Sequence, residues 1–141
     1  MKKLSRKDFE LYDETIYETW VKIKGVKEEM EFLLDTGSED EKKLQKMIDF
    51  ANKFLEWIVK NDLEVKKYAC KKLLKLKNKT WLEAKEKPVT EKEFIKRIKL
   101  SSIFINADKS AALTYDADEM FTDHAILIDL SKNQKLTDAY L

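Results

Sequence analysis

The chain has 141 residues, with 28 Lys and Arg against 27 Asp and Glu and a formal net charge of +1 at pH 7. A chain of this length forms one domain, residues 1–141, and buries enough surface to fold without a metal ion or a disulfide. Its single cysteine, Cys70, excludes an internal disulfide and suits a reducing compartment. No apolar stretch follows the basic N-terminus, so we expect a cytoplasmic protein without a signal peptide or a membrane-spanning helix.

The first third of the sequence is typical of β-structure. Residues 9–12 begin a strand, and residues 15–24 place β-branched and aromatic side chains on one parity. A period of two marks a strand with one distinct face. Gly25 interrupts this pattern, and residues 26–34 predict a partner strand, so we expect an N-terminal β-hairpin.

Two to three helices are predicted after the hairpin. Ser38 and Glu41 form a capping box that begins the first helix. Apolar residues then recur at steps of three and four, which indicates one buried helix face. The sequence Lys-Asn-Asp at residues 60–62 predicts a break before a second helix, and a second capping box at Thr90 and Glu93 predicts a short third one.

Lysines dominate the predicted second helix. Seven of them, and no acid, lie between residues 66 and 79, whereas residues 8–56 contain seven bases and fourteen acids. We interpret the lysines mainly as the solvated face of an amphipathic helix. Two alternatives stay open, a surface that binds nucleic-acid phosphates and a contact for a protein partner, with Lys67, Lys71 and Lys75 as candidates.

The last forty residues return to β-structure. Residues 103–105, 111–115, 124–130 and 136–141 are predicted strands separated by polar turns. Such a run favours an antiparallel meander. The predicted fold is therefore α+β, with an N-terminal β-hairpin, two to three helices, and a C-terminal meander with the helices packed on one face.

Residues 74–82 read Leu-Lys-Leu-Lys-Asn-Lys-Thr-Trp-Leu, and Thr90 to Phe94 is followed by residues 98–103. These stretches resemble the "LKN-x-TWL" and "T-x-x-x-F…L-x-x-I" blocks of a bacterial family called domain of unknown function 2262. Residues 116–126 resemble an acidic turn that leads into "F-x-G-H-x-I", except that Asp123 stands where the pattern has glycine. The resemblance covers roughly residues 65–130, and more loosely the N-terminal hairpin and the first long helix. It implies no activity, cofactor or catalytic residue.

The densest polar cluster is the segment from Asp116 to His124, the only histidine. Asp116, Asp118, Asp123 and His124 are candidate ligands for Mg²⁺, Mn²⁺ or Ca²⁺, because these ions prefer oxygen donors. His124 is also a candidate general base, oriented by Asp116 or Asp123. The alternative is a solvated hairpin loop that precedes a strand. The parity of that strand places His124 on the same side as Ile126.

Further side chains are candidates for contact with a partner or for reactivity. Trp57 lies beside the main apolar stripe of its helix, which suggests partial exposure and a place in an interface. Cys70 lies inside a helix, where a small buried residue is expected more than a reactive thiolate. Asp118 and Glu119, in the acidic segment, are candidate contacts for a basic partner.

No established catalytic motif, phosphate-binding loop or dinucleotide fingerprint occurs in the sequence. We therefore expect a non-enzymatic protein without a cofactor that binds another protein, such as an inhibitor or immunity-type protein of bacterial or phage origin. A homodimer is compatible with the uneven charge. The alternatives are a metal- or nucleotide-dependent enzyme centred on the acidic segment, and a nucleic-acid-binding module that uses the lysines of residues 66–79.

Overall fold

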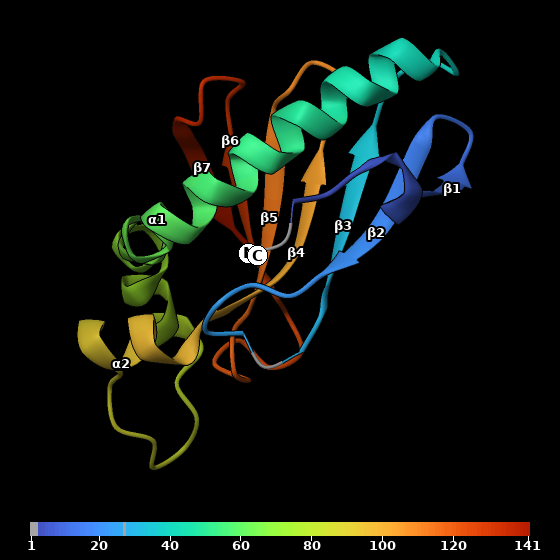
Figure 1. Cartoon of the computed structure of the whole chain (residues 1–141). Coiled ribbons are helices and arrows are strands. Elements are labelled where there is room, and N and C mark those ends of the chain that lie inside the picture. The colour runs from blue at the N-terminus through green and yellow to red at the C-terminus, as the bar shows by residue number, and fades with distance from the viewer. Residues whose placement is uncertain (1–2, 27) are drawn as a thin grey trace.

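The computed structural model of the chain describes residues 3–26 and 28–141. The expected strand over residues 26–34 and the basic N-terminus therefore lie partly outside the described residues. Seven strands form one sheet, and two helices lie on one side of it (Figure 1). The elements are a short 3₁₀-helix η1 (Arg6–Asp8), β1 (Glu10–Asp13), β2 (Ile16–Val21), β3 (Met30–Asp35), α1 (Glu41–Thr80), α2 (Glu91–Arg97), β4 (Lys99–Ile105), β5 (Ala111–Asp116), β6 (Ile126–Leu130) and β7 (Leu136–Tyr140).

The strands follow one another across the sheet in chain order, from β1 to β7. All neighbours are antiparallel except β3 and β4, which are parallel. Parallel neighbours need a long crossover, and the segment that holds α1 and α2 supplies it. The predicted α+β fold, with its hairpin, meander and helices on one face, is confirmed. The sequence did not indicate that hairpin and meander join into a single sheet.

The predicted break at residues 60–62 is wrong, because α1 is one continuous helix. The helix nevertheless changes direction part-way along its length (Figure 1). Within α1 the side-chain amide of Asn61 donates a hydrogen bond to the backbone oxygen of Trp57 at 2.8 Å. A side chain that enters the backbone ladder is a known cause of helix bending. The polar residues that predicted two helices thus lie inside one helix.

Of the two predicted capping boxes, the one at Thr90 begins a helix as expected and the one at Ser38 does not. Ser38 does not cap α1. Asp40 does, accepting the Lys42 amide at 2.9 Å, and the Ser38 hydroxyl accepts the Asp40 amide at 3.1 Å. The hydroxyl of Thr90 accepts the Glu93 amide at 3.2 Å, which confirms the predicted start of α2.

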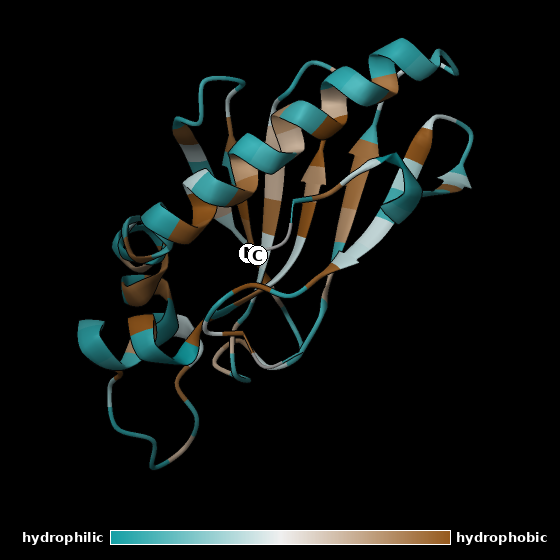
Figure 2. Ribbon diagram, viewed as in Figure 1, coloured by the Kyte–Doolittle hydropathy of each residue, from teal (hydrophilic) through white to brown (hydrophobic). Residues whose placement is uncertain are grey.

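The core lies between the sheet and the helices. Figure 2 shows hydrophobic positions of α1 toward the strands and hydrophilic positions away from them. Phe32, Leu34 and Ile48 are among the side chains with no exposed surface. Burial of each such side chain contributes about 1.5–3 kcal/mol, so this interface supplies most of the stability.

A partly buried polar link joins the sheet to the long helix. The hydroxyl of Tyr115, on β5, donates to Asp62 on α1 at 2.5 Å, and Asp62 also pairs with Lys66 at 3.1 Å. Burial and the Asp62 carboxylate raise the pKa of Tyr115 well above its ordinary value. The tyrosine therefore stays protonated and acts as a fixed donor. Neither helix in the described ranges combines the length and apolarity that a membrane crossing requires.

Candidate functional site

The acidic segment forms the connection between β5 and β6. Its backbone takes a left-handed conformation at Asp118, Glu119 and Thr122, with φ of 49°, 60° and 57°. Met120 and Phe121 anchor it, because both side chains are buried in the core. The segment is therefore a compact turn held by apolar contacts, and its polar side chains are left at the surface.

The carboxylates of this turn have separate partners. Asp116 accepts the backbone amide of Asp118 at 2.7 Å. The Asp118 carboxylate and backbone oxygen both accept from Arg97 of α2 at 2.8 Å. Asp123 accepts from the neighbouring hydroxyl of Thr122 at 3.3 Å. Within residues 3–26 and 28–141, no three Asp, Glu, His or Cys side chains come together as metal ligands do.

The His124 side chain is exposed and lies against Trp81. The two rings meet edge to face, with centroids 5.4 Å apart. In the described part of the chain, no hydrogen bond joins the imidazole to Asp116 or Asp123, so neither carboxylate orients it as a general base requires. The predicted strand that began at His124 begins only at Ile126, so strand parity does not apply to His124, whose side chain lies at the surface.

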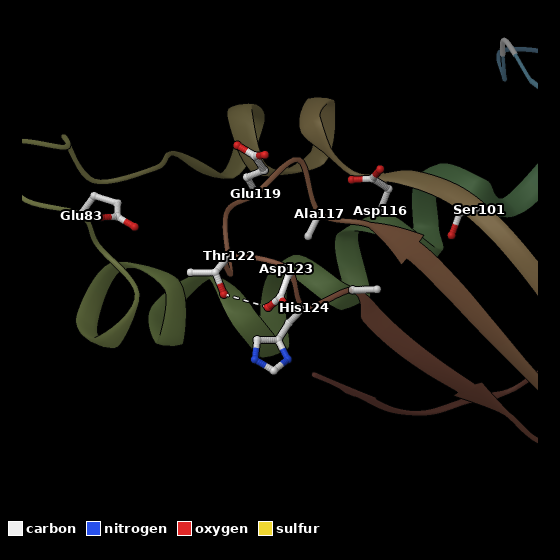
Figure 3. Close-up of a pocket in the computed structure, with 9 residues that line it drawn as sticks. Glu83, Ser101, Asp116, Ala117, Glu119, Thr122, Asp123 and His124 are labelled. Carbon is white, nitrogen blue, oxygen red and sulfur yellow. Dashed lines mark hydrogen bonds between the residues drawn. The ribbon is translucent and has the colours of Figure 1, made fainter.

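An open depression of about 620 Å³ lies beside this turn, and Figure 3 shows residues that line it. Asp116 and Ser101 lie at one end of the depression and Glu83 at the other, while the His124 ring points away from Asp116 (Figure 3). The arrangement offers a shallow polar surface. It does not bring an acid, a base and a nucleophile to one point.

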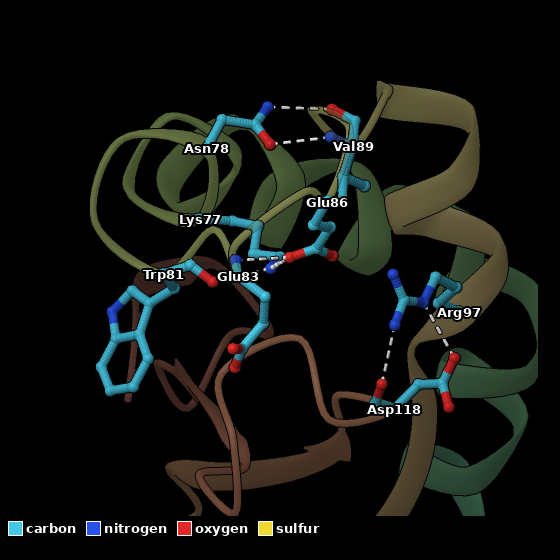
Figure 4. Close-up of polar contacts among 8 residues, drawn as sticks. All are labelled: Lys77, Asn78, Trp81, Glu83, Glu86, Val89, Arg97 and Asp118. Carbon is cyan, nitrogen blue, oxygen red and sulfur yellow. Dashed lines mark hydrogen bonds and ion pairs between the residues drawn. The ribbon is translucent and has the colours of Figure 1, made fainter.

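The family-like block at residues 74–82 has a structural role that explains its specific string. Asn78 donates to the Val89 backbone oxygen at 2.9 Å and accepts the Val89 amide at 2.7 Å (Figure 4). Lys77 has only 1% of its surface exposed and donates to the Trp81 backbone oxygen and to Glu86, each at 2.8 Å. These bonds fix the loop between α1 and α2.

The Lys77–Glu86 pair also corrects the interpretation of the lysine run. Lys77 is a buried internal partner and does not belong to a solvated face. Its hydrogen bond to Glu86, helped by the Glu83 amide, lowers the pKa of Glu86 below the ordinary value. The ion pair therefore persists at neutral pH.

The three lysines predicted as partner contacts lie close together along α1. Lys67, Lys71 and Lys75 lie on one side of α1 and flank a groove of about 450 Å³ beside α2, with Leu74 half-buried in it. Burial raises the pKa of Cys70, which also lines this groove, so its thiol is protonated and unreactive at neutral pH.

Exposure distinguishes the tryptophans. Trp57 is half-buried, and its ring centroid lies 5.9 Å from that of Phe54. Trp20, on β2, exposes 54% of its surface. Trp20, Trp57 and Trp81 were all candidates for an interface, and the sequence favoured Trp57 as the partly exposed one. The strand parity of Trp20 indicates only that it faces away from the core, and parity does not show whether another layer covers that side.

Trp20 belongs to what we call the uncovered face, the side of the seven strands that points away from α1. Both helices lie on the opposite side (Figure 1). Along β2 and β3, every residue of the uncovered face is half-buried or exposed, while every alternate residue is buried. Leu33 and Phe104 are paired neighbours at its centre and remain only half-buried.

Acids collect on the strands of this face. In the described chain the seven strands contain one base, Lys99, and eight acids, none of them buried. The acids are Glu10, Asp13, Glu18, Glu31, Asp35, Asp116, Asp129 and Asp138. Partial burial and the carboxylate of Glu18 raise the pKa of Glu31 above its ordinary value. Glu18 and Glu31 therefore repel each other in the free protein.

A family model described as "Uncharacterized protein conserved in bacteria (DUF2262)" matches residues 8–141. The chain belongs to this family. The match extends well beyond the blocks at residues 65–130 and includes the N-terminal hairpin and all of α1. No curated protein and no solved structure matches the chain.

Proposed function

We propose that this member of the DUF2262 family acts by binding another protein, and that it does so through the uncovered face of its sheet. The observation that carries the proposal is the exposure of Trp20, 54% of whose surface is open to solvent on a regular strand. Tryptophan is enriched among the residues that dominate binding energy in protein interfaces. Tyr140, 38% exposed on β7, adds a second aromatic ring near the other edge.

The uncovered face is large enough for this role. Seven strands at a spacing of about 4.8 Å, each about five residues long, give a projected area of about 500 Å². A standard interface buries about 800 Å² of accessible surface on each partner. The face alone therefore supplies a large part of one half of such an interface, with half-buried apolar residues at its centre and acids around them.

An inhibitor or immunity-type protein acting in the cytoplasm of a bacterium or phage-infected cell fits this description. Such a protein works by covering a surface of its target and needs no reaction centre of its own. The separately paired carboxylates of the turn before His124 agree with this class.

Site-specific photo-crosslinking in the cell that makes the protein tests the proposal. One variant carries an aromatic photo-crosslinking residue, which keeps a large ring at the site, in place of Trp20. Its control carries the same residue in place of Lys43, an exposed position on α1. We expect a defined protein adduct from position 20 alone, and the purified adduct partner should bind wild type more tightly than Trp20→Ala. No adduct at position 20, or the same adducts at both positions, would contradict the proposal.

A further inference from the structure

We propose that the partner of the uncovered face is an arginine-bearing basic segment of another protein. This inference rests on the proposed function and names the chemistry of the partner. Across their seven strands the described residues place eight acids and a single base, a net charge of −7 before any contribution from the loops. A surface of this charge favours a basic partner and repels nucleic acid.

The long helix carries the opposite charge. In α1, twelve lysines stand against five acids, a net charge of +7. The molecule is therefore polarised between its two layers, with the acids directed away from the helix side. The field of the uncovered face attracts cations in solution and orients a basic partner toward the sheet.

Aromatic rings lie beside carboxylates at two places on this face. Trp20 is the cross-strand neighbour of Glu31. The hydroxyl of Tyr140 lies 3.3 Å from a carboxylate oxygen of Asp129, which is itself paired with Asp138 across the strands. A guanidinium group can stack on a ring and donate to a carboxylate at once, whereas an ammonium group acts as a point charge. This combination selects arginine over lysine.

The two places set the length of the segment. Trp20 lies on β2 and Tyr140 on β7, five strand spacings apart, which corresponds to about 24 Å. An extended chain advances about 3.3 Å per residue. A segment of about seven or eight residues, laid across the strands, therefore reaches both places.

A basic partner would reduce the repulsion between carboxylates on the uncovered face. The raised pKa of Glu31 reflects partial burial and repulsion from Glu18, and cross-strand like charges such as Asp129 and Asp138 oppose folding. A guanidinium between two carboxylates removes that repulsion. The relieved repulsion lowers the Kd of a basic segment, and by mass action a tighter-binding segment stabilises the folded chain more at a given concentration.

Calorimetric titration of the full chain with octa-arginine, octa-lysine and octa-glutamate peptides tests the inference. We expect octa-arginine to bind, octa-lysine to bind several-fold more weakly, and octa-glutamate not to bind. Two variants should each weaken octa-arginine binding roughly tenfold, namely Trp20→Ala and the double variant Glu18→Gln/Glu31→Gln.

The matched control is Glu39→Gln/Glu56→Gln, which removes the same charge at exposed positions outside the sheet. It should bind octa-arginine nearly as wild type does. Melting curves of all variants check that each is folded, and we expect the Glu18/Glu31 variant to be no less stable than wild type.

Three results would overturn the inference. The first is no binding of octa-arginine, or equal weakening by the control and the Glu18/Glu31 variant. The second is octa-lysine binding as tight as octa-arginine with no effect of Trp20→Ala. The third is self-association that buries Trp20, which would make a second copy the occupant. A crosslinked partner without a basic segment would refute only this inference, whereas no partner at position 20 would refute the proposed function itself.

Discussion

The two faces of the sheet are built from the same strands and differ in almost everything else. On β3, Phe32 and Leu34 face α1 and have no exposed surface, while Glu31, Leu33 and Asp35 face away and remain half-buried. One face contributes the core that folds the chain. The other contributes little to folding and contains repelling acids, so its composition is free to serve binding.

The comparison is sharpest for two large aromatic residues on opposite faces. Phe32→Ala should lower the free energy of unfolding by about 3–5 kcal/mol, because it empties a fully buried site. Trp20→Ala should change it by about 0.5 kcal/mol or less, because the side chain is mostly in water. Urea unfolding of both variants measures the difference. Similar losses would mean that the uncovered face is part of the core.

The helix side extends past the sheet into the corner between α1 and α2. Asn78→Ala removes two hydrogen bonds to Val89 and should cost about 2 kcal/mol. Lys79→Ala, at an exposed neighbour on the same helix, is the control and should be nearly neutral. Thermal melting compares them. If both were neutral, the family-like block would need an explanation other than the fixing of this loop.

On the uncovered face, removal of an acid should stabilise the free protein. Because the folded chain raises the pKa of Glu31, its native state holds a proton more tightly than the unfolded chain does. The tighter binding of this proton stabilises the folded state at low pH. The stabilisation falls as pH rises through the carboxylate range and is fully lost above the folded pKa. The free energy of unfolding of Glu31→Gln should therefore exceed that of wild type by about 0.5 kcal/mol at neutral pH. This value is reduced for solvent screening.

The pH dependence supplies the check on that variant. The advantage of Glu31→Gln should shrink toward zero below about pH 4, where the wild-type carboxyl is protonated in both states. Denaturant melts at several pH values measure it. An advantage independent of pH would show that repulsion between Glu18 and Glu31 is not its cause.

A similarly small effect on stability is expected at His124. His124→Ala loses an edge-to-face contact with Trp81 and should cost about 0.5 kcal/mol. Neither wild type nor the variant should gain stability from Mg²⁺ or Mn²⁺. A metal-dependent rise in the melting temperature of wild type alone would favour the rival metal-dependent enzyme, since a bound ion stabilises by mass action.

Local patterns in the sequence predicted the elements well, because strand parity and helix periodicity depend on near neighbours. The cap of α2 at Thr90 and the burial of the apolar helix stripe follow from such patterns. The parallel pairing of β3 with β4 could not be predicted from local patterns, because it depends on a crossover of some sixty residues. Asn61 and Asp62 look like a helix break because their side chains compete for backbone hydrogen bonds.

The candidate site was harder to predict for the same reason. Asp116, Asp118 and His124 are close in sequence, yet their side chains contact three different groups, a backbone amide, Arg97 and Trp81. Their density in the sequence therefore did not mean that the side chains converge. The spacing of Lys77 in the sequence fitted the exposed lysine face of the helix. Its side chain is buried instead, because it pairs with Glu86 on the loop between α1 and α2. The uncovered face joins acids from strands far apart in the chain, and only the sheet order brings them together.

Amide NMR mapping of the full chain with octa-arginine tests the central claim most directly. The account predicts that shifts concentrate on the uncovered face from β2 to β7, with the largest near Trp20 and Tyr140, and that residues 44–58 of α1 change little. Shifts centred on Lys67, Lys71 and Lys75, on the turn before His124, or spread evenly over the molecule would contradict it.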